Sequence, residues 1–303
     1  MWVITAIAST LAAGSIAVFN LANNLQYIPI GIIGISFATA ALPSLSESVT
    51  LKNREEFIKG LAKIVRLVFF IVLPVSVLMF ILRAQIVRIV LGSGEFVWID
   101  TQLTAAALGI FCVGIFAHSL IPAFSRAFYA TQDTRTPVLV SIMSMAVNVV
   151  LSFLFVYLAL DESRAITAIK VFLDLENINN VALLGLPLAF AIAGIFNFSA
   201  LFYMLSKKYA DTFLVSSIYS AVIKISFSSV IAGLAGYGML YLVEPFLNTE
   251  TFFGIFIQAG FASVAGGGAY LLCMYILKSS EMYSLISIAR KKIGLSSGAK
   301  SRT

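Results

Sequence analysis

Residues 14–47 read GSIAVFNLANNLQYIPIGIIGISFATAALPSLSE, and this stretch decides the fold. It holds no charged residue before Glu47, and a helix needs only about 20 largely apolar residues to cross a bilayer. A helix also satisfies its own backbone hydrogen bonds, which lipid cannot do. We therefore expect one membrane-spanning helix over roughly residues 15–46.

The polar side chains of this helix recur at positions i, i+3, i+4 and i+7, which is the spacing of a single helical face. They are Asn20, Asn23, Asn24 and Tyr27. Such a face has two interpretations. It can form hydrogen bonds to a neighbouring helix, which contribute about 0.6 kcal/mol each in membrane proteins, or it can line a water-filled cavity. The spacing leaves both open, and the four residues are candidate cavity residues.

Pro29 and Gly31 follow this polar face directly. Proline removes a backbone donor inside a helix and kinks it. Broken helices recur in transporters that alternate between two states. We therefore predict a helix break or hinge at Pro29 and Gly31, with a plain kink as the alternative.

The composition indicates a protein whose solvent is largely lipid. The 303 residues are 60% hydrophobic and only 11% charged, with a mean hydropathy of +1.00, whereas soluble domains carry about 25% charged residues. The net charge of +6 does not indicate nucleic-acid binding, because the cations lie in the connectors between apolar runs. We expect membrane lipids, and no nucleic acid, as partners.

Seven full spans and one partial span are expected from the apolar runs, which makes the chain an all-α polytopic membrane protein. The spans cover roughly residues 1–13 (partial), 15–46, 60–82, 102–130, 137–160, 181–206, 214–243 and 252–277. The runs are too long and too continuous for the alternating strands of a membrane barrel. The long connector 161–180 has apolar residues at helical spacing beside charges, so it forms either a short interfacial helix or a flap.

Lysine and arginine concentrate in every second connector and in the C-terminal tail. Cytoplasmic loops carry this excess, so we expect the C-terminus in the cytoplasm. The start, MWVITAIASTLAAGSIAVF, lacks the basic region and cleavage site of a signal peptide. We expect the chain to begin partway through a larger protein.

The sequence offers no catalytic constellation. It contains no H-E-x-x-H, phosphate-binding loop or G-x-S-x-G motif, and Cys112 and Cys273 lack a metal-binding spacing. We expect no enzyme activity, no catalytic residue, no metal and no cofactor. Arg126, in SRAFYATQDTRTP, either pins its loop through Asp133 and its neighbours or faces a cavity, and it is a further candidate site residue.

Three blocks of sequence together resemble the lipid II flippase family (MurJ/MviN). The first block carries Gly14–Ser15, then Pro29–Ile30–Gly31, then Leu42–Pro43–Ser44–Leu45–Ser46. The second is LGSGEFVWIDTQLTAAAL and the third is RAFYATQDTRTPV. The blocks occur in the family's order at plausible spacing, and the resemblance runs over nearly the whole chain.

The resemblance implies the multidrug/oligosaccharidyl-lipid/polysaccharide exporter fold, with two six-helix lobes around a central cavity and an additional helix pair. On that scheme the chain comprises a partial helix (1–13), the second lobe (14–209), an additional pair forming a lipid-tail groove (210–278) and a basic cytoplasmic tail (279–303). The first lobe would be a partner, in the same chain or in a separate one. The implied function is translocation of lipid II, an undecaprenyl-pyrophosphate sugar-peptide, across the bacterial cytoplasmic membrane by alternating access.

One departure from the family pattern concerns the polar face. The resemblance places an arginine at the position of Asn24 and an acidic residue at that of Tyr27, so the charge pair is neutral here. Asn24 either binds the pyrophosphate or forms hydrogen bonds across the cavity. Two other functions remain open, namely a flippase for another polyprenyl-linked polysaccharide and a truncated, non-transporting membrane scaffold.

Overall fold

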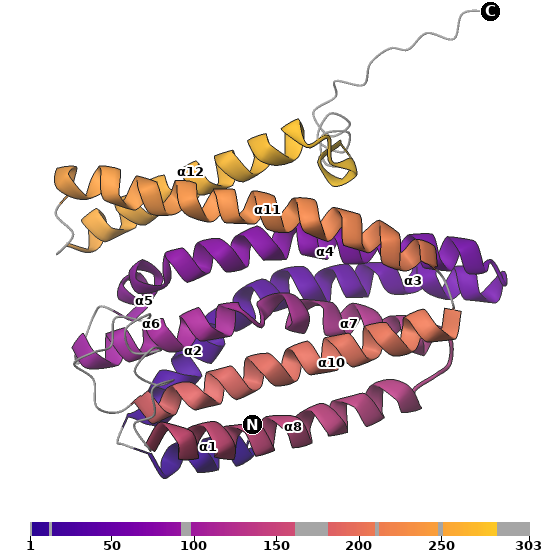
Figure 1. The fold of residues 1–303 in the computed structure, drawn as a ribbon, viewed down its shortest axis with the longest axis horizontal. Helices are drawn as coiled ribbons and strands as arrows, with labels where there is room; N and C mark the ends of the chain where they lie inside the picture. The colour runs from indigo at the N-terminus through magenta and orange to yellow at the C-terminus, as the bar shows by residue number, and fades with distance from the viewer. Residues whose placement is uncertain are drawn as a thin grey trace, which may run out of the picture.

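A computed structural model describes residues 2–11, 14–91, 98–160, 181–209, 212–247 and 251–283. Helices, turns and a few connecting residues make up this described part of the chain (Figure 1). The prediction of an all-α chain is therefore confirmed for the described residues. The predicted helix or flap at 161–180, residues 92–97 of the second predicted connector and the tail beyond 283 lie outside them.

The elements follow the predicted spans closely. In chain order they are α1 (Trp2–Ser9), α2 (Ser15–Pro29), the π-helix η1 (Ile30–Ile35), α3 (Ser36–Thr50), α4 (Arg54–Ile81), α5 (Arg83–Leu91), α6 (Trp98–Cys112), α7 (Ile115–Ala130), α8 (Arg135–Leu160), the 3₁₀ turn η2 (Val181–Leu184), α10 (Gly185–Tyr209), α11 (Thr212–Val243), the 3₁₀ turn η3 (Glu244–Phe246) and α12 (Phe252–Ile276). Six helical segments of the described chain are long and apolar enough to cross a membrane. The bent pair α6–α7 makes a seventh, so the prediction of about seven spans is confirmed.

The first span is one continuous helical segment of 36 residues, Ser15–Thr50, with the π-helix η1 inside it. Buried positions before η1 recur every three or four residues, and so do those after it, but the second set is displaced by about one residue. An α-helix turns about 100° per residue, and a π-turn accommodates one extra residue. The π-helix therefore keeps one side of α2 and α3 buried and the other side exposed along the whole span.

Gly34 explains where this π-helix packs. A Cβ atom at Gly34 would lie 2.6 Å from the backbone oxygen of Ser119 on α7, so the two backbones approach too closely for any side chain there. A Cβ atom added at Gly31, three residues earlier, would have no atom within 4 Å. Of these two glycines, only Gly34 lies at the close contact between η1 and α7.

The span predicted at 102–130 is a bent pair rather than a single straight helix. The axes of α6 and α7 differ by 46° at a break around Val113 and Gly114. A Cβ atom at Gly114 would lie 2.9 Å from the Cα of Ala191 on α10. The bend therefore lies at a close contact of α7 with α10, while Pro122 is accommodated inside α7.

The helices form a layered bundle. α11 and α12 lie side by side along one side, α8 lies at the opposite side next to α10, and α7 lies between α4 and α10 (Figure 1). Aromatic contacts fill the interior, among them Phe19 against Phe111 at 5.6 Å and Phe124 against Phe198 at 5.6 Å between ring centroids. The α11–α12 pair is joined to the rest of the bundle mainly through α4.

Candidate functional site

The predicted polar face of α2 divides into an exposed part and a buried part. Asn20, Asn24 and Tyr27 are exposed, Tyr27 at 50%. Asn23 is only 4% exposed, and its side-chain oxygen accepts a hydrogen bond of 2.9 Å from the Nε2 of Gln26, which is fully buried. The structure thus brings three of the four predicted residues together on the surface and turns Asn23 inward.

Gln26 is a residue that the spacing argument missed. Its Oε1 is buried and has no hydrogen-bond partner among the described residues. Gln26 lies at the edge of the predicted arc, one turn from Asn23, so two amides of this helix bond to each other inside the bundle. For Asn23 and Gln26, the structure therefore fits the first of the two interpretations, in which the polar side chains form hydrogen bonds inside the helix bundle.

The exposed face continues past η1 along α3. Its polar members are Ser36, Thr39, Ser44 and Glu47. Thr39 Oγ1 donates to the Ile35 carbonyl at 2.7 Å and Ser44 Oγ donates to the Ala41 carbonyl at 3.0 Å. Because their protons are used within the helix, these hydroxyls offer lone pairs to a ligand or to water.

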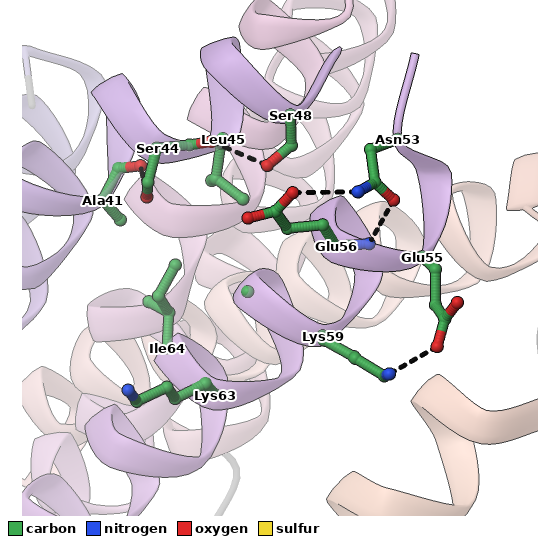
Figure 2. A pocket seen from close by; sticks show the side chains of 11 residues that line it. Ala41, Ser44, Leu45, Ser48, Asn53, Glu55, Glu56, Lys59, Lys63 and Ile64 are labelled. Carbon is green, nitrogen blue, oxygen red and sulfur yellow. Dashed lines mark hydrogen bonds and ion pairs between the residues drawn. The ribbon is translucent and has the colours of Figure 1, made fainter. Parts of the chain in front are cut away.

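The polar face ends in a pocket of about 590 Å³ between α3 and the start of α4, which we name the α3–α4 pocket (Figure 2). Its polar lining comes from both helices and the turn between them: Ser44, Ser48, Asn53, Glu55, Glu56, Lys59 and Lys63. Ala41, Leu45, Gly60 and Ile64 form the apolar part of the wall. Sequence reasoning missed this pocket because its charged residues read as an ordinary connector.

A helix cap shapes the pocket entrance. Asn53 Oδ1 accepts from the backbone N–H of Glu56 at 3.1 Å, and Asn53 Nδ2 donates to Glu56 Oε2 at 3.0 Å. This reciprocal arrangement resembles a capping box and stabilises the N-terminus of α4. Lys59 forms an ion pair with Glu55 one turn away. Lys63 is exposed, and Figure 2 draws no interaction from its ammonium group to the other lining residues.

Arg126 lies on α7 apart from the network that was expected to hold its loop. Asp133 accepts from the backbone N–H of Thr136 at 3.1 Å and from its hydroxyl at 3.0 Å, and it pairs with Lys208 at 3.4 Å. The Thr136 N–H bond, followed by the hydroxyl bond and the Lys208 ammonium, lowers the pKa of the Asp133 carboxyl below its usual range. Arg126 Nη1 is buried and has no hydrogen-bond partner in the described part of the chain. The loop is therefore pinned through Lys208 on α10.

Pro29 and Gly31 flank the start of the π-helix. Pro29 is the last residue of α2 and is buried, and Gly31 lies in η1 with open space beside its Cα. The predicted irregularity is therefore a π-turn within a continuous helix. Whether this position moves as a hinge stays a prediction.

The family model for "Lipid II flippase MurJ" matches residues 1–261. The chain belongs to the lipid II flippase MurJ family. The predicted family is thereby confirmed, and the match extends from α1 into α12.

Individual members of the MurJ family are similar over different lengths. The "Probable lipid II flippase MurJ" of Borreliella burgdorferi is 34% identical over 148 residues, which is 48% of this chain and 29% of that protein. The protein of the same name from Buchnera aphidicola subsp. Acyrthosiphon pisum is 25% identical over 277 residues, covering 90% of this chain and 49% of the relative. This chain thus matches about half, or less, of the length of these relatives.

A solved MurJ structure has the same fold. "Lipid II flippase MurJ, inward closed conformation" superimposes with a TM-score of 0.64 at 22% identity, over 91% of this chain and 50% of that one. At this identity the likeness supports the fold alone. This chain aligns with only half of that protein, and the assignment of its helices to one of two lobes stays a prediction.

This MurJ-family chain also has an apolar groove, whose lining residues sequence reasoning did not single out. It has a volume of about 440 Å³ and lies between α4, α7, α10 and α11. Its lining is largely aromatic and aliphatic: Val65, Phe69, Leu73, Phe116, Phe198, Phe202, Ile218, Tyr219, Val222 and Ser226. A groove of this composition suits a hydrocarbon chain, and one wall belongs to the helix pair expected to hold the lipid tail.

Proposed function

We propose that this chain is the C-terminal part of a lipid II flippase, which moves an undecaprenyl-pyrophosphate sugar-peptide from the inner to the outer leaflet of the bacterial cytoplasmic membrane. The proposal depends on one observation above all. A spanning segment of 36 residues keeps a continuous exposed side on which Asn20, Asn24 and Tyr27 lie. Polar groups facing pure hydrocarbon are costly, so this side would face a hydrated cavity.

The physical task is to carry a charged, sugar-bearing headgroup across about 30 Å of hydrocarbon. In the proposed mechanism the headgroup crosses within the cavity while the tail stays in lipid along the apolar groove. The cavity opens alternately to each side, and no covalent bond is made or broken. Pro29, Gly31 and the π-helix η1 are proposed to accommodate the bending of this span between the two states.

The remaining components are proposed on the same basis. A first lobe, in the same or a separate chain, would provide the opposite wall of the cavity, since this chain covers about half of the Buchnera aphidicola relative and of the solved MurJ structure. The lysine- and arginine-rich ends of the helices would face the cytoplasm, which places the α3–α4 pocket and the end of α12 on that side. Arg126 would contribute a cation near this end of the cavity.

Depletion of the protein in its native cells tests the function. We expect lipid II to disappear from the outer leaflet, as measured by its accessibility to an externally added enzyme or probe, and the cells to lyse. If depleted cells keep their outer-leaflet lipid II and lose only a surface polysaccharide, the substrate is a different polyprenyl-linked glycan and the proposal is wrong.

A further inference from the structure

The α3–α4 pocket lies at the end of the exposed polar face, and its shape suits a ligand rather than a single ion. Its volume of about 590 Å³ is within the range of about 300–1,000 Å³ typical of small-molecule sites. Ser44 of the polar face is also part of the pocket wall, so the two surfaces are continuous. A headgroup that enters along this face would reach the pocket without leaving the protein surface.

The charges of the pocket are balanced. Two carboxylates, Glu55 and Glu56, face two ammonium groups, Lys59 and Lys63. A pyrophosphate would meet as much repulsion as attraction there, since like and unlike charges at similar distances cancel. A hydrocarbon tail would offer no group of opposite charge to Glu56 or Lys63, the two charges outside the Glu55–Lys59 ion pair. A ligand that carries both carboxylate and ammonium groups fits this lining best.

Two of the four charges are available for such a ligand. Glu55 and Lys59 neutralise each other in their ion pair. Lys63 has no ion pair among the described residues, and Glu56 uses only its Oε2 to accept from Asn53, which leaves Oε1. Seven positions separate Glu56 from Lys63, so the two side chains lie two turns apart on the same face of α4. Together they present one anion and one cation along the pocket.

We infer that the α3–α4 pocket binds the peptide of the lipid-linked headgroup, a short peptide with free carboxylates and an ammonium side chain. Lys63 pairs with a peptide carboxylate and Glu56 Oε1 with the peptide ammonium, while the Ser44 and Ser48 oxygens accept from peptide N–H groups. The Asn53 cap holds the Glu56 carboxylate in place before the ligand arrives. The inference rests on the proposed function, because only a sugar-peptide headgroup brings such a peptide to this face.

Binding of a soluble peptide to the full chain in lipid nanodiscs tests the inference. The probe is a synthetic pentapeptide with two free carboxylates and one lysine ammonium, and its affinity is measured by thermophoresis or by NMR. We expect Lys63→Gln and Glu56→Gln each to weaken binding roughly tenfold, as for loss of one charge-assisted hydrogen bond. Lys207→Gln makes the same charge change on the exposed end of α10, outside the pocket, and should leave the affinity unchanged.

A charge exchange separates electrostatic pairing from damage to the fold. Lys63→Glu should abolish peptide binding, and adding Glu56→Lys should restore it in part, because the exchanged pair still presents one charge of each sign. A pentapeptide with its amine acetylated and its carboxylates amidated should not bind. Unchanged affinity in both Lys63→Gln and Glu56→Gln, or equal affinity for the neutralised peptide, would overturn the inference.

The two proposals fail in different ways. If the protein translocates a lipid-linked disaccharide with and without its peptide at equal rates, and the peptide alone does not bind, then the pocket has another role and the flippase proposal stands. If no lipid-linked pyrophosphate is translocated or bound at all, the proposed function fails, and the inference fails with it.

Discussion

Arg66 Nε lies 3.3 Å from Glu281 Oε1, and this ion pair joins α4 to the residues that follow α12. Glu281 is only 6% exposed, and its second oxygen accepts from Ser279 Oγ at 2.5 Å. On the same side of α4, Tyr270 donates to the Phe70 carbonyl at 2.6 Å. The α11–α12 pair, whose helix α11 forms one wall of the apolar groove, is therefore joined to the bundle by polar contacts as well as by packing.

Replacing Glu281 by Gln should destabilise the protein by about 2 kcal/mol. Breaking a fully buried ion pair costs about 3–5 kcal/mol, and the cost is smaller here because Arg66 keeps 27% of its side chain exposed. The measurement is thermal or denaturant unfolding in detergent micelles. Glu55→Gln is the matched control, because the Glu55–Lys59 pair is exposed and such pairs contribute at most about 1 kcal/mol. Equal effects of the two substitutions would contradict a special role for Glu281.

Gly34→Ala should be strongly destabilising, whereas Gly31→Ala should be close to neutral. The new Cβ at position 34 would lie 2.6 Å from the Ser119 oxygen, and the obstructing atoms are backbone, which cannot rotate away. Overpacking of this kind costs about 1–3 kcal/mol. The unfolding midpoints of the two variants in the same detergent provide the comparison. If Gly34→Ala unfolds at the same midpoint as Gly31→Ala, the result would contradict a close backbone contact between η1 and α7 at Gly34.

Asp133 should contribute a pH-dependent increment to stability. Its pKa is lowered in the folded protein by the Thr136 hydrogen bonds and Lys208, so the folded state binds the proton less tightly than the unfolded state does. The increment is therefore fully present above the ordinary carboxyl pKa of about 3.9 and is lost as the pH falls below it. Because 26% of the Asp133 side chain and 40% of the Lys208 side chain are exposed, solvent screens the pair and we expect a small effect. Asp133→Asn should unfold at a lower midpoint than the wild type at pH 7, and the difference should shrink at pH 3. A difference that grows on acidification would contradict this sign.

Much of this fold could be predicted because lipid imposes a simple rule on sequence. A spanning helix must be apolar over a minimum length, so the limits of α10 and α12 follow from composition to within a few residues. The helix α4 begins earlier than the predicted span, at Arg54, because its first turns are charged. The position of the π-helix η1 cannot be predicted from composition, because a π-turn adds only one residue to an otherwise continuous apolar helix. What fixes it is the contact of Gly34 with Ser119 on a helix far along the chain.

The site was predictable to a lesser degree, for a related reason. Helical spacing placed Asn23 and Asn24 on one broad face, but the two residues differ by about 100° in direction. Packing of α2 in the bundle buries one edge of that face, which includes Asn23, and leaves Asn24 exposed. Lys63 illustrates the same limit, since a cation near a helix end becomes part of a pocket only when α3 turns back beside α4.

Asn24 provides the sharpest test of the polar face, because the family resemblance places an arginine there. In the complete flippase, Asn24→Arg should raise lipid II translocation if this position contacts the pyrophosphate, since arginine adds a charge-assisted hydrogen bond. Asn24→Ala should lower translocation roughly twofold to tenfold, as expected for one lost hydrogen bond, without changing the unfolding midpoint, because Asn24 is exposed. The readout is the rate at which lipid II becomes accessible in the outer leaflet. Asn23→Ala is the contrasting variant, because it leaves the buried Gln26 amide without its partner and should cost about 1–3 kcal/mol of stability. If Asn24→Ala and Asn24→Arg both translocate at the wild-type rate, Asn24 does not contact the substrate.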